Sequence, residues 1–208
     1  MAIVRTFSLP HFDDYPVQVA MFTEVTNANF LRSQLLEANP EFDYAFLDAS
    51  MIISSLPLFH AIAHAIHSVL SPTTSPLRTR TPHSEIVFRL HSNNNIGESY
   101  RKFGIADDTT NLIAIKLSLT PEVTNASVAD HLTAVVQGVG VDEGEDGGQL
   151  GMFADMAKIR KVYKLNDVRS KGKVAKKPES KDQDEQTKVN ERVRMERDIM
   201  GIMTLKGS

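Results

Sequence analysis

The sequence predicts a mixed α/β fold (α+β), with helices packed around a small central sheet. Short apolar segments of strand length alternate along the chain with longer segments of helical period. A central block, residues 83–115, contains a sharply capped short helix between two segments with strand character. Apolar residues make up 41% of the 208 residues, which is enough for a sizeable core. We therefore expect one domain, followed by a linker and a C-terminal helix.

Composition sets the expected domain boundaries. Residues 1–169 should form the domain, with an acidic, glycine-rich and mobile insertion at 138–151. Residues 170–187 have almost no apolar side chains, so we expect a disordered, charged linker there. Residues 188–208 should form a helix that packs on the domain or on a partner.

The first half of the chain predicts alternating strands and helices. We expect strands at 17–22 and 44–47, and helices at 27–38 and 55–70. A loop rich in Pro, Ser and Thr follows at 71–82. The second helix has the apolar stripe of a core-facing helix, formed by Phe59, Ile62, Ala63, Ile66, Val69 and Leu70.

The central block predicts a strand, a short helix and a second strand. Residues 85–90 alternate between two faces, as in a half-buried strand. Asn95 followed by Glu98 forms an Asn version of the capping box, and Gly104 suits a left-handed helix end. Residues 112–117 should be the second strand.

Basic character increases toward the C-terminus. Residues 1–141 hold 8 basic and 13 acidic side chains, whereas the remaining residues hold 15 and 13. After a predicted helix at 128–136, residues 154–164 form a basic amphipathic stretch. Its segment 158–164 mixes cations with an aromatic ring, which suits RNA but equally suits an ordinary surface helix. This charge distribution would favour an acidic partner or RNA.

Several functional classes find no support in the sequence. With no cysteine, disulfides, thiolate metal sites and cysteine nucleophiles are excluded. No Gly-x-Ser-x-Gly, Walker or dinucleotide-binding pattern occurs. We see neither an apolar run long enough to span a membrane nor a secretory signal. We expect a protein without catalytic activity, cofactor or metal.

Three histidines and two arginines are the candidate contact residues. His60, His64 and His67 follow each other on one helical face, away from the apolar stripe. Three interpretations of these histidines stay open: solvated side chains, a contact surface or metal ligands. Metal binding is disfavoured because Ala61 occupies the position at which a zincin motif carries its catalytic glutamate. Arg78 and Arg80 in the 71–82 loop are either phosphate contacts or solvated charges.

The last helix is rich in methionine and other apolar residues. Such a helix either packs back on the domain core or provides an adaptable surface for a partner.

The quoted motifs resemble a known family. Asp43-Tyr-Ala-Phe-Leu-Asp-Ala-Ser50, Asn94-Asn-Ile96 and Lys102-Phe-Gly-Ile-Ala-Asp-Asp-Thr109 are similar to the subunit of the KEOPS (EKC) complex that binds its small kinase, the PRPK-binding protein family. The resemblance covers about residues 15–141, and more weakly 158–165 and the C-terminal helix.

The resemblance implies a non-catalytic adaptor. Members dock on the N-terminal lobe of the small kinase/ATPase subunit and stimulate it, in a complex that makes threonylcarbamoyladenosine in tRNA. They can hold the CCA tail of the tRNA, and the complex is tied to telomere maintenance. We accordingly expect a monomer within the complex that meets the other subunits indirectly, binds no membrane, and resides in nucleus and cytoplasm.

The resemblance also nominates residues. Arg78, Arg80 and His64 occupy positions where relatives carry basic groups, so they are the candidates for tRNA contact. Four apolar residues of the last helix are the candidates for kinase docking or tail binding: Ile199, Ile202, Met203 and Leu205. The alternatives are a free-standing RNA-binding protein and a small metal-dependent hydrolase that uses the histidines.

Overall fold

A five-stranded antiparallel sheet lies at the centre of the described part of the chain. A computed structural model describes residues 1–165 and 181–206. The sheet order is β1-β2-β4-β3, and β5 pairs with the end of β2 beyond β1. The strands are β1 (Val4–Phe7), β2 (Val17–Thr23), β3 (Ala45–Asp48), β4 (Leu112–Leu117) and β5 (Val139–Val141).

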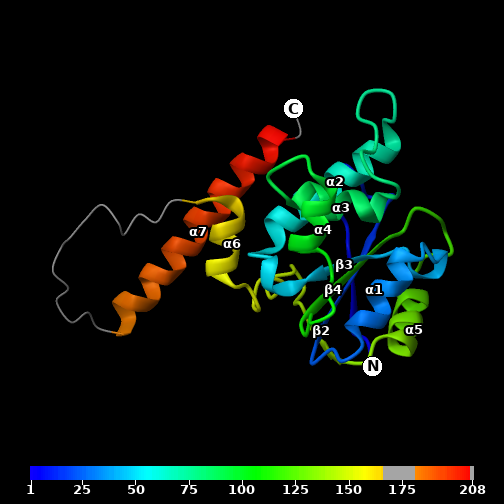
Figure 1. Ribbon diagram of the computed structural model, residues 1–208, viewed down its shortest axis with the longest axis horizontal. Helices are drawn as coiled ribbons and strands as arrows, with labels where there is room; N and C mark the ends of the chain where they lie inside the picture. The colour runs from blue at the N-terminus through cyan, green and yellow to red at the C-terminus, as the bar shows by residue number, and fades with distance from the viewer. Residues whose placement is uncertain (166–180, 207–208) are drawn as a thin grey trace.

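Helices cover both faces of this sheet (Figure 1). Val19 and Met21 of β2 point to a core shared with α2, α3, α6 and α7, whereas Ala20 and Phe22 point to a second core beneath α1 and α5. The helices are α1 (Ala28–Leu36), α2 (Ser55–Leu70), α3 (Pro82–Leu90), α4 (Ile96–Phe103), α5 (Asn125–Val135), α6 (Met156–Tyr163) and α7 (Lys181–Lys206). Short 3-10 turns occupy Pro40–Phe42 and Ala49–Met51.

The predicted mixed α/β class is confirmed, as are most of the predicted elements. The strands at 17–22, 44–47 and 112–117 and the helix at 55–70 lie within two residues of their expected bounds. The Asn95 side chain accepts a hydrogen bond from the Glu98 backbone N–H at 2.9 Å, so the predicted N-cap of α4 is confirmed. The second half of the predicted capping box is wrong, because the Asn95 N–H donates to the Asn93 side chain instead. No helix among the described residues is long and apolar enough to cross a membrane.

Residues 85–90, predicted as a strand, lie in the helix α3. Thr81 is its N-cap and accepts from the Ser84 N–H, and Pro82 takes the first helical position. The buried positions His83, Ile86, Val87 and Leu90 follow helical spacing, which the alternation of residues 85–90 obscured.

The predicted left-handed conformation of Gly104 is wrong. Its φ is −72° and its ψ 165°, which any residue can adopt. Glycine suits this position because a Cβ would lie 2.7 Å from the carbonyl oxygen of Tyr100. This close packing lets the chain leave α4 alongside β3, where the Ile105 N–H donates a hydrogen bond to the Phe46 carbonyl oxygen.

The acidic insertion at 138–151 is not the loose loop that was expected. Its first residues form β5, and Glu143 and Leu150 are fully buried. Glu145 and Asp146 are exposed, so the acidic character faces solvent only in part.

The last helix is longer than predicted. α7 begins at Lys181, so residues 181–187, which were expected to be linker, are helical. The rest of that predicted linker, 170–180, lies outside the described residues. β1 was not predicted at all.

Candidate functional site

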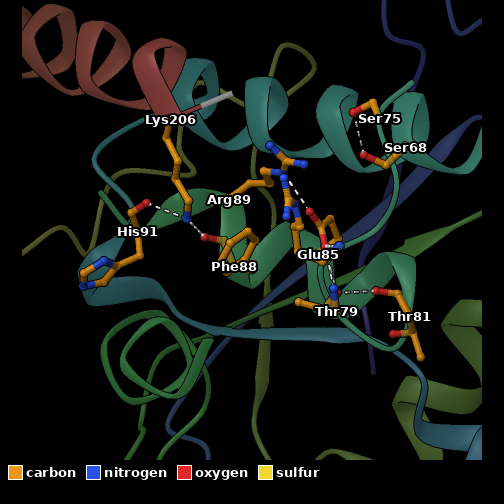
Figure 2. A network of polar contacts seen from close by, with 10 residues as sticks. Ser68, Ser75, Thr79, Thr81, Glu85, Phe88, Arg89, His91 and Lys206 are labelled. Atoms are coloured by element: carbon orange, nitrogen blue, oxygen red, sulfur yellow. Dashed lines mark hydrogen bonds and ion pairs between the residues drawn. The ribbon is translucent and has the colours of Figure 1, made fainter. Parts of the chain in front are cut away.

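A buried carboxylate organises the loop that carries Arg78 and Arg80. Glu85 of α3 is 0% exposed, and its Oε2 accepts from the backbone N–H groups of Arg78 and Thr79 at 2.9 and 3.0 Å and from the Thr79 hydroxyl at 3.0 Å. Its Oε1 accepts from Nε of Arg89, one helical turn later, at 2.8 Å (Figure 2). Because the loop backbone is fixed to α3, the exposed Arg78 and Arg80 side chains project from a defined position.

Two of the three histidines lie beside this network. The rings of His60 and His64 meet edge to face with centroids 4.7 Å apart, and both side chains are half-buried. Burial, followed by the charge of Arg89, lowers the pKa of His60. Burial, His60 and Arg89 lower the pKa of His64. These imidazoles therefore favour the neutral form at physiological pH.

The expectation of plainly solvated histidines is correct only for His67, which is exposed. Nε2 of His60 is enclosed and has no hydrogen-bond partner. Among the described residues, no group of three or more His, Cys, Asp or Glu side chains is placed to hold a metal ion.

The end of α7 reaches the same region from the other side. Lys206 donates to the carbonyl oxygens of Phe88 and His91 at the C-terminal end of α3, and its Nζ lies 3.6 Å from the centroid of the Phe88 ring (Figure 2). A cation is favourable at that end of a helix. Burial, followed by the charge of Arg89, lowers the pKa of Lys206 to about 8.

The apolar candidates on α7 separate into two groups. Ile199 and Met203 are 1% and 3% exposed and belong to the domain core, so a partner cannot contact them in this arrangement. Ile202 is partly buried, and Leu205 is 78% exposed. Of the four proposed docking residues, only Ile202 and Leu205 are accessible.

Ile202 and Leu205 line a shallow groove between α6 and α7. Its basic side chains are Lys164, Arg194 and Arg197. Gly201, where an added Cβ would meet nothing within 4 Å, leaves its wall open. The groove combines apolar side chains with these three cations and one carboxylate, that of Asp198.

The buried His83 has a structural role. Its Nδ1 lies 3.0 Å from a carboxylate oxygen of Asp43, and its Nε2 accepts from the Leu117 N–H at 3.0 Å. Burial lowers its pKa despite the opposing effect of Asp43. Its Nε2 is therefore occupied by a backbone N–H of β4, and its Nδ1 is enclosed beside Asp43, so this imidazole holds α3 against β4.

Comparison with known proteins places the chain in a family. Residues 22–207 match the family described as kinase binding protein CGI-121. The chain belongs to the CGI-121 family. This confirms the resemblance drawn from the sequence motifs.

Full-length relatives of the CGI-121 family occur in fungi. A Phaeosphaeria nodorum protein named EKC/KEOPS complex subunit CGI121 is 48% identical over 99% of this chain and 100% of its own length. The Aspergillus fumigatus protein of that name is 39% identical over 99% of this chain and 97% of its own length. The Coccidioides immitis protein is 36% identical over the whole of both chains.

Arg78, Arg80 and His64 were nominated from the sequence and stay predictions, whereas the residues that fix the arginine loop were missed. Glu85 and Arg89 were assigned to the same face of a strand, although their i, i+4 spacing is also that of a helical ion pair. Thr81-Pro82 was the available signal, because it starts a helix. No sequence signal indicated that Lys206 would cap α3.

Proposed function

We propose that this chain is a non-catalytic subunit of a KEOPS-type complex, in which it binds and stimulates the small kinase and helps to hold tRNA. Membership in a family described by kinase binding carries the proposal. Relatives that align over their full length are named as subunits of the EKC/KEOPS complex. Threonylcarbamoyladenosine formation on tRNA is then the process that the chain serves.

The groove between α6 and α7 is the proposed kinase-docking surface. Ile202 and Leu205 supply apolar area, and Lys164, Arg194 and Arg197 would complement acidic residues on the partner. Ile199 and Met203 act indirectly here, because they fix α7 to the core.

The surface of α2, α3 and the 71–82 loop is the proposed tRNA contact. Arg78 and Arg80 can bind phosphates of a single-stranded CCA tail, and the Glu85 network holds their backbone in place. His64 adds positive charge only on acidification, because its pKa is lowered. The proposed tRNA contact and the proposed kinase-docking surface thus lie on different elements.

The tRNA contact is tested by reversing the loop charges. We expect Arg78→Glu combined with Arg80→Glu to lower tRNA affinity at least ten-fold and to flatten its dependence on salt, because two phosphate contacts are lost. Fluorescence anisotropy at several salt concentrations measures this.

Arg32→Glu is the matched control. Arg32 is an exposed cation on α1, on the other side of the sheet, and pairs with Asp107. Its reversal should leave tRNA affinity within about two-fold of wild type. Equal affinity of the double variant and the wild type would remove Arg78 and Arg80 from the tRNA site.

A further inference from the structure

Glu143 is a buried carboxyl group that the proposed function does not use. It lies just after β5, is 0% exposed, and neither of its oxygens has a hydrogen-bond partner. An ionised carboxylate is strongly disfavoured in such a place, whereas a neutral carboxyl group is tolerated. Burial accordingly raises the pKa of Glu143 from 4.5 to about 7.

The loop that contains Glu143, residues 142–151, contacts β1, α2, the core and α7. Its turns are held by hydrogen bonds from Gly147 N–H to the Gly144 carbonyl and from Gln149 N–H to the Glu143 carbonyl, both 3.0 Å. Leu150 inserts into the core and is 0% exposed. At Gly147 the loop approaches α2 so closely that an added Cβ would lie 3.2 Å from the Phe59 ring and 3.4 Å from Ser55.

The end of the loop is attached to α7. Arg192 of α7 donates to the Gly151 carbonyl at 3.1 Å and to the Ile53 carbonyl at 2.6 Å. Displacement of Gly151 therefore removes one of the two backbone contacts of Arg192 and leaves the contact to Ile53, which precedes α2.

The charged groups around this loop are already occupied. Arg5 of β1 binds both oxygens of Asp142 at 2.9 and 2.7 Å, so its charge is largely satisfied by that partner. From α7, Arg192 binds backbone carbonyls, and Glu196 accepts from Ser54. The adjoining first turns of α2 present Ser55 and Phe59, which carry no charge. The charges of Asp142 and Arg5 act on the Glu143 carboxyl through space and with opposite sign, and among the described residues no hydrogen bond reaches its two oxygens.

We propose that the loop of residues 142–151 is a pH-sensitive latch, closed on α2 while the Glu143 carboxyl is protonated and released when that carboxyl ionises. Release lets the carboxylate reach water, withdraws Leu150 from the core and separates Gly151 from Arg192. The latch goes beyond the proposed function, since it needs neither kinase nor tRNA.

The direction of the pH dependence follows from linkage. The pKa of Glu143 is higher in the closed loop than in the open one, so closure is complete below about pH 4.5 and weakens as the pH rises toward 7. The ratio of closed to open loop should fall about ten-fold per pH unit between roughly pH 5 and 7, and then become constant.

Hydrogen exchange of the full chain tests this dependence. We expect the protection of the Gly147 and Leu150 amides, corrected for intrinsic exchange, to fall about ten-fold per pH unit between roughly pH 5 and 7. Glu143→Gln should remove the dependence, because the amide cannot ionise. Glu145→Gln, on an exposed position of the same loop, should retain it. A flat profile in the wild type, or an unchanged slope in Glu143→Gln, would overturn the latch.

A direct titration keeps the proposal testable even where Glu143→Gln does not fold. The carboxyl carbon of Glu143 in the wild-type chain can be followed by NMR against pH. A midpoint raised above 4.5 toward 7, accompanied by shifts at Leu150, is the expected result, because opening of the loop on ionisation holds the observed midpoint below the pKa of the closed loop. A midpoint near the ordinary value of 4.5 would refute the latch.

Discussion

The carboxylate of Glu85 is enclosed by protein and accepts hydrogen bonds from the Arg78–Thr79 loop and from Arg89. A buried charge is tolerated only when it is paired and fully hydrogen-bonded. Removing it would leave Arg89 without its counter-ion and two loop N–H groups without an acceptor. The identity of this one side chain therefore fixes both the local stability and the position of the arginine loop.

We expect Glu85→Ala to lower the free energy of unfolding by about 3–5 kcal/mol, the usual cost of breaking one half of a buried ion pair. Urea denaturation followed by circular dichroism measures it. Asp107→Asn, which breaks the exposed pair with Arg32, should cost less than about 1 kcal/mol. Similar losses in both variants would mean that the Glu85 network contributes no more than a surface pair.

Individual contact residues could be predicted from the sequence only where exposure was enough to identify them. Arg78 and Arg80 stand in a loop between elements, and their exposure follows from that. The burial of Glu85 and the role of Lys206 depend on contacts between α3, the loop and α7, which lie far apart in the chain. The local composition of the sequence does not indicate such contacts.

Among the secondary-structure elements, α3 shows where local patterns compete. Residues 85–90 alternate as in a strand, but Thr81 and Pro82 start a helix and the buried positions repeat with helical spacing. The start signal outweighs alternation over so short a segment. α2 was predictable as a helix because its apolar residues repeat with helical spacing. Its buried face is shifted from the predicted stripe, since Leu58, Ala61 and Ala65 are buried and Leu70 is exposed. β1 has only four residues, which are too few for a strand pattern to be recognised in the sequence.

Gly97 in α4 and Gly104 directly after it provide a matched test of close packing. At Gly104 a Cβ would lie 2.7 Å from the Tyr100 carbonyl oxygen, so Gly104→Ala should lower the free energy of unfolding by about 1–3 kcal/mol. At Gly97 the nearest atom is 3.4 Å away, and alanine there should be neutral or stabilising by up to about 1 kcal/mol. Thermal denaturation compares the two. A Gly104→Ala variant as stable as Gly97→Ala would contradict this account of the turn after α4.

The complete chain presents two surfaces joined by α7. The arginine loop is fixed to α3, and Lys206 at the end of α7 caps α3. The proposed docking groove lies between the same α7 and α6. Fold class, family and three of the five described strands (β2, β3 and β4) were accessible from the sequence. The fold class and the family depend on patterns that extend over many residues. The distinction between core and surface residues on α7 required the packed structure.

Binding to the small kinase is the central claim, and size-exclusion chromatography tests it most directly. The purified chain and the kinase subunit, mixed at micromolar concentration, should co-elute in a one-to-one complex. The Arg78→Glu, Arg80→Glu double variant should co-elute as well, since those residues lie outside the groove, whereas Leu205→Glu should reduce the complex. Separate elution of the wild-type chain and the kinase would contradict the account.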